Sequence, residues 1–538
     1  MNLITKDSNL TEQYNDLNSL NNASITLTDN FPIEKNTEKL QIKENMTDRE
    51  IVMLLFKNSF WIIWSQFILA FLNNITLEVL GNLNLEKQSG TLMPFIFIGD
   101  IYSIYAAIGY GIIFSSFYFN LKYANRNKNE EFGNYTIYSI ILILIFSTVL
   151  FFIIFFFSDY FMPFSENHLG TIIKKHLLIG HFYTIFHLIN TSFMLLLFVK
   201  NLNFYSAIFD TITCISYFLI MKFYFEVKYC NEITKQNNNN TFNNNISNSV
   251  DINDLNNQNI SNDKVKIQEE IYLTIAWILN LLYLLQFILY ISFFIIKRPF
   301  KETKILSFKR YLKGFWFFSI YSFDFILIGF FNLNFTSDLN LLFINSPEQK
   351  ILKISGYKIS QGIIYIIQKI SIGYFFALVK ISKNLKVKRL NGFLSKLIKL
   401  YFYFTIPIVL FFAIFIFILG DFLPTLFSND INVKSAMVEY LRVMIFIILP
   451  FHFEISMRGV LISYKKKRFL TYVYFTITVL YNFPLGLILS RVYNLDNISI
   501  YISAYSTEIF LGLIFFYYVR KLKSYEAIDE EKYSIISV

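Results

Sequence analysis

Twelve separate apolar stretches, each long enough to cross a lipid bilayer, constrain the fold of this 538-residue chain more than any other feature. A helical crossing needs roughly 20 mainly apolar residues. Only 16% of the residues are charged, whereas soluble domains carry about 25%. The sequence therefore predicts an all-α polytopic membrane protein. Its crossings are expected near residues 58–83, 93–120, 137–157, 177–199, 203–225, 271–296, 312–334, 359–379, 400–420, 437–461, 470–490 and 500–519.

The loops between these stretches alternate between rich and poor in Lys and Arg, and this alternation predicts the orientation. Basic residues that flank crossings stay on the cytoplasmic side. The segments on one side hold more than twice as many Lys and Arg as those on the other, which include the two longest loops. Both termini are therefore predicted to be cytoplasmic. The basic run from Lys465 to Arg468 and the net charge of +10 follow from the same bias, so no nucleic acid is expected as a partner.

Two regions lie outside the predicted membrane body. Residues 1–50 are polar and lack the pattern of a signal peptide, so they are predicted to form a flexible cytoplasmic tail. Residues 231–263 are predicted to form an Asn-rich, low-complexity loop on the outer side. The other predicted domains are a first six-helix bundle, with five crossings in 51–230 and the sixth in 264–299, a second bundle in 300–520, and a cytoplasmic C-terminal tail in 521–538.

A weak internal repeat divides the crossings into two sets of six. The first and seventh crossings end in Gly-Asn-Leu-Asn-Leu at 81–85 and Phe-Asn-Leu-Asn-Phe at 331–335. The third and ninth end in Asp-Tyr-Phe-Met-Pro at 159–163 and Asp-Phe-Leu-Pro at 421–424. Because six crossings are an even number, the two units have the same orientation and are related by a pseudo-twofold axis along the membrane normal. This is a transporter architecture, with the substrate path between two six-helix bundles.

Motifs for enzymes and for nucleotide use are missing. The chain has no Gly-x-x-x-x-Gly-Lys-Ser/Thr sequence, so neither ATP-driven pumping, an enzyme activity nor a cofactor is predicted. His176, His181 and His187 are spaced by five and six residues and fall on different faces of a helix. No metal site is therefore expected.

Carboxylates within the crossings are the strongest candidates for coupling-ion sites, because a charge at a helix centre costs roughly 2.5 to 3.5 kcal/mol. Asp324 lies halfway along the seventh crossing without a basic neighbour in its own helix, and it is the leading candidate. Glu454 in the tenth crossing and Asp100 in the second are further candidates. Glu454 has Arg458 four residues later, so a structural ion pair is an equally open interpretation. Asp210 lies near the cytoplasmic end of the fifth crossing and is expected to be solvated.

Neutral polar side chains within the crossings are candidates for lining a substrate cavity. The same residues can instead form hydrogen bonds between helices, and the sequence leaves both roles open. They are Gln66, Asn73 and Asn74 in the first crossing, His187 and Asn190 in the fourth, and His452 in the tenth.

Residues between Asp421 and Leu487 follow a distinctive order. They read Leu-Pro-Thr-Leu-Phe-Ser-Asn-Asp at 423–430, Tyr-Leu at 440–441, Pro at 450, Gly-Val-Leu at 459–461 and Pro-Leu at 484–485. This order resembles the ninth-to-eleventh-helix pattern of the multidrug and toxic compound extrusion (MATE) transporters. Helix number, loop sizes and duplication resemble the family from residue 55 to residue 520. The chain departs from the family pattern in the turn after the second crossing, at Ser371 in the eighth crossing, and at two acidic positions. The helix-one acid of the family falls at Thr76 and its helix-seven acid at Ser322.

The resemblance implies a secondary active transporter that exports organic cations or amphipathic xenobiotics in exchange for H⁺ or Na⁺. Its partners would be the lipid bilayer, a small organic cationic substrate and the coupling ion. It would act as a monomer in the plasma membrane or an endomembrane. Two alternatives stay open: a lipid-linked oligosaccharide flippase of the same superfamily, and a channel or receptor without coupled transport, against which the duplication argues.

Overall fold

The computed structural model describes residues 46–82, 88–124, 132–161, 168–229, 231, 253–298, 308–331, 347–387, 393–493 and 496–536. Within these ranges, 12 helices are long and apolar enough to cross a membrane. Each of the crossings predicted from the sequence overlaps one of these helices, so the number of crossings is confirmed.

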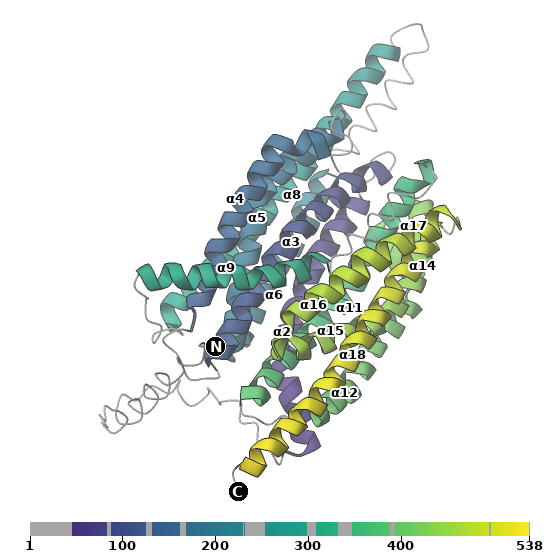
Figure 1. The fold of residues 1–538 in the computed structure, drawn as a ribbon. Helices are drawn as coiled ribbons and strands as arrows, with labels where there is room; N and C mark the ends of the chain where they lie inside the picture. Colours follow the sequence, from purple (N-terminus) through teal and green to yellow (C-terminus); the bar gives the residue numbers. More distant parts are fainter. Residues whose placement is uncertain are drawn as a thin grey trace, which may run out of the picture. The chain divides into compact units, whose positions relative to one another are not determined.

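The first half of the chain contributes crossings one to six (Figure 1). These are α2 (Asp48–Asn82), α3 (Gln88–Ala124), α4 (Asn134–Phe161), α5 (His168–Val199), α6 (Asn203–Leu219) with its π-helical continuation η2 (Ile220–Glu226), and α8 (Asn253–Lys297). α2 starts at a capping box, in which the Glu50 carboxylate accepts from the Thr47 N–H at 2.7 Å and the Thr47 hydroxyl accepts from the Glu50 N–H at 3.3 Å. α8 begins inside the predicted Asn-rich loop, because no Gly or Pro in 253–263 interrupts the helix of the sixth crossing.

The second half contributes crossings seven to twelve. These are α9 (Phe308–Phe331), α11 (Pro347–Val387), α12 (Phe393–Ile418), the series α14 (Ile431–Met444), η3 (Ile445–Ile447) and α15 (Ile448–Ser463), the series α16 (Lys467–Tyr474), η4 (Phe475–Asn482) and α17 (Phe483–Arg491), and α18 (Asp496–Ile536). Crossings ten and eleven change helix type just before Pro450 and Pro484. A proline has no backbone N–H to continue the α-helical hydrogen bonds, which accounts for both irregular turns.

The residues that resemble the MATE pattern form the entrance to the tenth crossing. A short helix, α13 (Leu423–Phe427), precedes α14. The Asp430 side chain caps α14 by accepting from the backbone N–H of Asn432 at 2.8 Å. Gly81 of α2 lies directly against the carbonyl of Phe427, where any larger residue would collide with the backbone. The pattern therefore encodes a capped turn that packs on the first crossing.

Burial separates central crossings from peripheral ones in the same way in both halves. In α3, α5 and the series from α14 to α15, 72% of the apolar window is buried, and in α11 67% is buried. No other crossing exceeds 39%. Crossings two and four of each six are thus the central ones. The peripheral crossings expose large apolar side chains that suit contact with lipid, such as Phe156, Trp316 and Ile418.

Crossings four and ten end in the same turn. Asn201 and Lys465 have positive φ angles of 60° and 64°. In each turn the next backbone N–H donates to the carbonyl five residues earlier, at 2.8 Å and 3.0 Å. These are Schellman turns. The two turns are 264 residues apart in the chain, and so are the first residues of α6 and α16. The duplication inferred from short sequence matches is therefore visible in backbone geometry.

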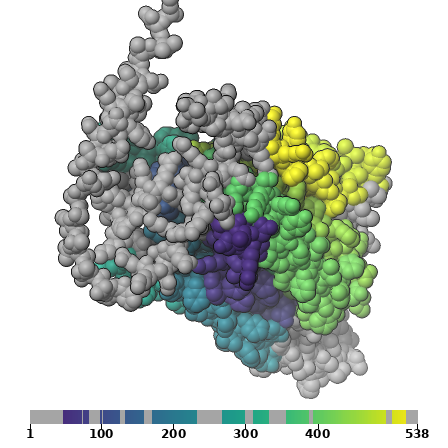
Figure 2. All heavy atoms as spheres, turned by 90° about the horizontal axis from the view of Figure 1, so that it is seen from below, coloured from purple at the N-terminus to yellow at the C-terminus, as the bar shows by residue number. Residues whose placement is uncertain are grey.

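The two halves meet through two helix pairs that a pseudo-twofold axis exchanges. Crossing one packs on crossing eight, as α2 on α11, and crossing two packs on crossing seven, as α3 on α9. Glycines allow the close approach, because Gly373 lies against Ile63 in the first pair. Gly111 lies against Ile326 in the second. Figure 2 shows the purple of α2 directly beside the green of the second half. The predicted fold class, two six-helix bundles related by a pseudo-twofold, is confirmed.

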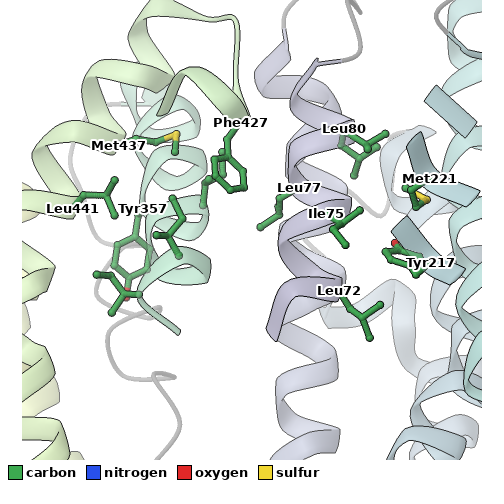
Figure 3. Close-up of a cluster of buried hydrophobic side chains, with 14 of the residues drawn as sticks. Leu72, Ile75, Leu77, Leu80, Tyr217, Met221, Tyr357, Phe427, Met437 and Leu441 are labelled. Atoms are coloured by element: carbon green, nitrogen blue, oxygen red, sulfur yellow. The ribbon is translucent and has the colours of Figure 1, made fainter. Parts of the chain in front are cut away.

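An apolar cluster joins the halves on the predicted outer side. Its α2 members lie between side chains of the first half and side chains of the second half (Figure 3). This packing holds the outer part of α2 against both halves. The labelled side chains are Leu72, Ile75, Leu77 and Leu80 of α2, Tyr217 and Met221 of the first half, and Tyr357, Phe427, Met437 and Leu441 of the second half.

Candidate functional site

The first polar cluster lies inside the first half and consists of Asn190 of α5, Asp210 of α6 and Gln286 of α8. The Gln286 amide donates a hydrogen bond to the Asp210 carboxylate, and the Gln286 Oε1 accepts from the Asn190 Nδ2 at 2.8 Å. The three residues are only 1% to 2% exposed. The second Asp210 oxygen makes no regular hydrogen bond to any described residue. The Ser65 hydroxyl of α2 also lies beside the carboxylate. A buried carboxylate whose polar neighbours are all neutral is costly as an anion, so this geometry favours the binding of a proton or a cation.

A small recess borders the first cluster. Its lining includes His187, whose Nε2 is hydrogen-bonded to the Tyr110 hydroxyl at 2.9 Å. The recess has no room for a water molecule in this conformation. Access to Asp210 therefore requires the helices to move. The lining residues are Leu69, His187, Asn190, Thr191, Met194, Asp210 and Gln286.

The second polar cluster lies inside the second half and consists of Glu454 and Arg458 of α15, Tyr474 of α16 and Glu508 of α18. The Tyr474 hydroxyl donates to the Glu454 carboxylate and accepts from Arg458 Nη1 at 2.8 Å. Arg458 Nε lies 3.6 Å from Glu454 Oε1. Glu508 interacts electrostatically with both charged neighbours, and its Oε2 has no hydrogen-bond partner among the described residues. The cluster holds two carboxylates and one guanidinium, so it can accept one further positive charge.

The two clusters occupy matching positions in the repeat. Asn190 and Glu454 are 264 residues apart, and so are Asp210 and Tyr474. The third members, Gln286 and Glu508, lie on crossings six and twelve. The repeat therefore brings the same three crossings together in each half, but the carboxylates lie on different crossings in the two halves. The first half has a carboxylate on its fifth crossing and amides on its fourth and sixth, whereas the second half has a phenol on the eleventh and carboxylates on the tenth and twelfth.

Asp324, the leading sequence candidate, belongs to neither cluster. Its Oδ2 lies 2.8 Å from the ammonium of Lys467, which also donates to the Tyr321 carbonyl at 2.9 Å. In Figure 1, α9 crosses the neighbouring helices at a steep angle. Asp324 of α9 thereby contacts Lys467, the first residue of α16. Asp324 has no basic neighbour in its own helix, as the sequence indicates, but its counter-ion Lys467 comes from the eleventh crossing. Residue spacing within one helix does not predict such a partner.

The expectation that Asp210 is solvated is wrong. The residue is 1% exposed, because α2 and α8 both pack on α6. Its position near a predicted helix end indicated contact with water, but the neighbouring crossings extend past it. Asp210 therefore replaces Asp324 as the carboxylate with the weakest charge compensation among those described.

Three of the other sequence candidates form hydrogen bonds in the structure, and the side chains of the other two are not described. Gln66 lies at the boundary between the halves, where its Oε1 accepts from the ammonium of Lys369 at 3.1 Å. Asn74 donates to the Gly362 carbonyl at 3.1 Å and so links α2 to α11. His452 is hydrogen-bonded through both ring nitrogens in this conformation, to Thr405 at 2.8 Å and to Ser371 at 3.0 Å. The side chains of Asn73 and Asp100 lie outside the described residues.

The histidines of the fourth crossing each have a different partner. His176 is hydrogen-bonded to the Tyr272 carbonyl at 2.8 Å, and His181 to the Tyr105 hydroxyl at 3.0 Å. They point to separate neighbours, as their spacing indicates.

The sequence patterns assigned no role to Gln286, Lys369, Tyr474 or Glu508. The sequence matches at 159 and 421 are 262 residues apart and lead from Asp210 to Tyr472, so the offset of 264 residues that identifies Tyr474 comes from the structure. The cost of a charge inside a crossing applies to lysine as well as to carboxylates and would have identified Lys369.

These features define the class of the protein: a multi-pass, all-α integral membrane protein built from two six-helix repeats. The MatE family model matches residues 353–488, which include the whole stretch from Asp421 to Leu487 that resembles the family pattern. No curated protein sequence matches the chain.

Solved structures share this fold over most of their length. An outward-facing multidrug resistance MATE family transporter of the MOP superfamily aligns with a TM-score of 0.66 at 11% identity, covering 88% of this chain and 96% of the other. A eukaryotic MATE transporter gives 0.69 at 10% identity, with 89% and 99% covered. A MOP superfamily transporter from Pyrococcus furiosus gives 0.64 at 12% identity, with 89% and 97% covered. The chain thus carries a MatE sequence match and has the fold of MATE transporters of the MOP superfamily, which confirms the family resemblance.

Proposed function

We propose that this protein is a secondary active transporter that exports organic cations or other amphipathic compounds in exchange for H⁺ or Na⁺. The observation that carries the proposal is the pair of buried carboxylate clusters at matching positions of a duplicated membrane fold. In such a fold, the substrate path runs between the halves, and their relative motion opens it to one side of the membrane at a time. We propose that the protein acts as a monomer.

Asp210 is our first candidate for the coupling-ion site. It is buried, its polar neighbours Gln286 and Ser65 are neutral, and one of its oxygens is left without a regular hydrogen bond among the described residues. A proton or a sodium ion would remove the cost of the buried charge. Because α5, α6 and α8 each supply one member of the cluster, ion binding can change how these three crossings pack.

Glu454 is our second candidate, together with Glu508. Arg458 compensates one of the two negative charges, and the other remains available for a proton or a cation. Asp324 and Asp100 stay in the proposal as secondary candidates. The ion pair with Lys467 lowers the rank of Asp324, because a carboxylate with a counter-ion at 2.8 Å has less need of a transported cation.

We propose that the substrate path follows the two helix pairs at the boundary, α2 with α11 and α3 with α9. Gln66 lies at this boundary, and His187 and Asn190 line the adjoining recess of the first half. Asn73, Asn74 and His452 complete the candidates for the cavity. Asn74 and His452 are engaged in hydrogen bonds in this conformation, so their contact with a substrate would require those bonds to break.

The test is transport by the purified full-length protein in liposomes without ATP. An imposed H⁺ or Na⁺ gradient should drive uptake of a fluorescent organic dye, and collapse of the gradient with an ionophore should stop it. Strict dependence on ATP would contradict secondary transport. Dye flux that follows only its own gradient would favour the alternative of a channel without coupling.

A further inference from the structure

Three buried lysines share one face of α11, the eighth crossing. Lys380 and Lys383 lie about three and about four helical turns after Lys369, so the three side chains project in nearly the same direction. Lys369 and Lys380 are 6% exposed, and Lys383 is 3% exposed. Lys369 lies in the middle of the crossing predicted at 359–379, where a lysine costs roughly 2.5 to 3.5 kcal/mol on insertion scales. Lys380 and Lys383 follow the predicted end of that crossing but are buried as well.

Each of these ammonium groups donates to a neutral acceptor in the first half. Lys369 donates to Gln66 Oε1 at 3.1 Å, and Lys383 donates to the Tyr118 hydroxyl at 2.6 Å. Lys380 donates to the Phe198 carbonyl at 2.7 Å and to Asn201 Oδ1 at 2.6 Å. Because α11 belongs to the second half, all of these bonds cross the boundary between the halves.

An aromatic ring lies beside each of the three ammonium groups. Lys380 Nζ lies 4.4 Å from the centre of the Phe198 ring. Lys369 Nζ lies 4.6 Å from the centre of the Tyr365 ring and 5.7 Å from that of Tyr110. Lys383 Nζ lies 3.9 Å from the centre of the Tyr118 ring. The boundary thus combines positive charge with flat apolar surfaces, which together suit a ligand that has both an aromatic body and a negative group.

The carboxylates of the crossings are distributed differently. Asp210 lies inside the first half and Glu454 inside the second, on faces that pack within their own half. Asp324 has Lys467 as its counter-ion. No carboxylate lies within ion-pair distance of Lys369 among the residues that the structure describes. The boundary is therefore the positively charged region of the membrane body, and the interiors of the halves are its acidic regions.

Lys380 has a separate structural explanation. Its two acceptors belong to the Schellman turn that ends α5, where a cation stabilises the C-terminal carbonyls of a helix. We assign Lys380 to this capping role. Lys369 bonds to a side chain in the middle of α2, and Lys383 bonds to the Tyr118 side chain six residues before the end of α3, so neither of these bonds caps a helix.

We propose that Lys369 and Lys383 bind the anionic group of an amphipathic substrate when the two halves move apart. Alternating access requires this movement, and it takes from each ammonium the neutral partner that the first half supplies. Losing an acceptor in a water-poor path is costly for an ammonium group, and an anionic group of the substrate replaces the lost acceptor. The inference rests on the proposed transport function and narrows its substrates from amphipathic compounds in general to those with a negative group.

The test uses two dyes that share one ring system and differ in charge, the anion fluorescein and the cation rhodamine 123. Full-length protein in liposomes should carry fluorescein in preference to rhodamine 123 under an imposed H⁺ or Na⁺ gradient. In Lys369→Gln the ratio of fluorescein flux to rhodamine 123 flux should fall by about tenfold, which is the loss of one charge-assisted hydrogen bond. Lys369→Arg keeps the charge and should retain most of the ratio. Lys383→Gln should lower the ratio in the same direction.

The matched control is Lys399→Gln, which removes an exposed lysine that lies near an aromatic ring on α12. It should leave the ratio unchanged. Preferred transport of rhodamine 123 by the wild-type protein would overturn the inference and leave the proposed function standing, and this comparison needs no variant to fold. An unchanged ratio in Lys369→Gln would also overturn it. Transport of neither dye under either gradient would count against the proposed function itself, and the inference would fall with it.

Discussion

The polar clusters of the two halves occupy the same three crossings of their repeats, yet their charges are compensated differently. Asp210 of the first cluster receives a hydrogen bond from the neutral amide of Gln286. Glu454 of the second cluster has the guanidinium of Arg458 within 3.6 Å. The duplication thus preserves the three crossings whose polar residues are in contact, but it does not preserve the identity of those residues. The first cluster can exchange a proton or a cation without breaking an ion pair, whereas the second contains a permanent counter-ion.

The largest effect is expected from removing that counter-ion. Arg458→Met would leave Glu454 and Glu508 buried together without a positive charge. Breaking a buried ion pair on one side costs about 3 to 5 kcal/mol, so the variant should lose most of its folded population. Thermal unfolding in detergent, followed by size-exclusion chromatography, measures this loss.

The matched double variant Arg458→Met/Glu454→Gln removes one negative charge as well and should recover part of the stability. If Arg458→Met alone melts like the wild-type protein, the guanidinium is not the counter-ion of the second cluster, and the contrast between the clusters disappears.

The next largest effect is expected on gradient-driven dye exchange, and not on folding, when Asp210 is replaced. Asp210→Asn keeps the shape of the side chain but cannot bind and release a proton, so gradient-driven dye exchange should fall by at least about tenfold. The melting temperature should change little, because the amide still fits the site. Dye flux in liposomes at equal protein content gives the first quantity, and thermal unfolding gives the second. Normal exchange in Asp210→Asn would remove the first cluster from the coupling mechanism.

A smaller effect is expected at the carboxylate that the second cluster leaves uncompensated. Glu508→Gln would leave Glu454 and Arg458 as a balanced pair, so we expect the stability to change by less than about 1 kcal/mol. If ion coupling depends mainly on the first cluster, exchange should fall by less than about threefold. A loss of exchange as large as that of Asp210→Asn would show that the two clusters share the coupling role.

The smallest effect is expected at Asp324. Its ion pair with Lys467 is partly exposed, with side-chain exposures of 22% and 15%, and such pairs contribute about 0 to 1 kcal/mol. Asp324→Asn should therefore change both melting temperature and exchange less than Asp210→Asn does. The reverse order in the same flux assay would restore Asp324 as the leading coupling site.

The sequence predicted those contacts that are local in the chain. The Glu454–Arg458 pair follows from a spacing of four residues on one helix, and the structure has the two side chains in contact. The pair of Asp324 and Lys467 joins residues of the seventh and eleventh crossings, and no spacing rule identifies it. The burial of Asp210 likewise depends on how far α2 and α8 extend beside α6.

The sequence by itself determined the number of crossings, the fold class and the duplication, because each rests on hydrophobic length and on order along the chain. Only the tertiary structure decided which polar residues meet. Lys369 bonds to Gln66 across the boundary, and Gln286 bonds to Asp210 between two crossings of one half. Such contacts depend on the rotation and inclination of each helix, which are set by side-chain packing against its neighbours, and packing between crossings leaves no periodic trace in the sequence.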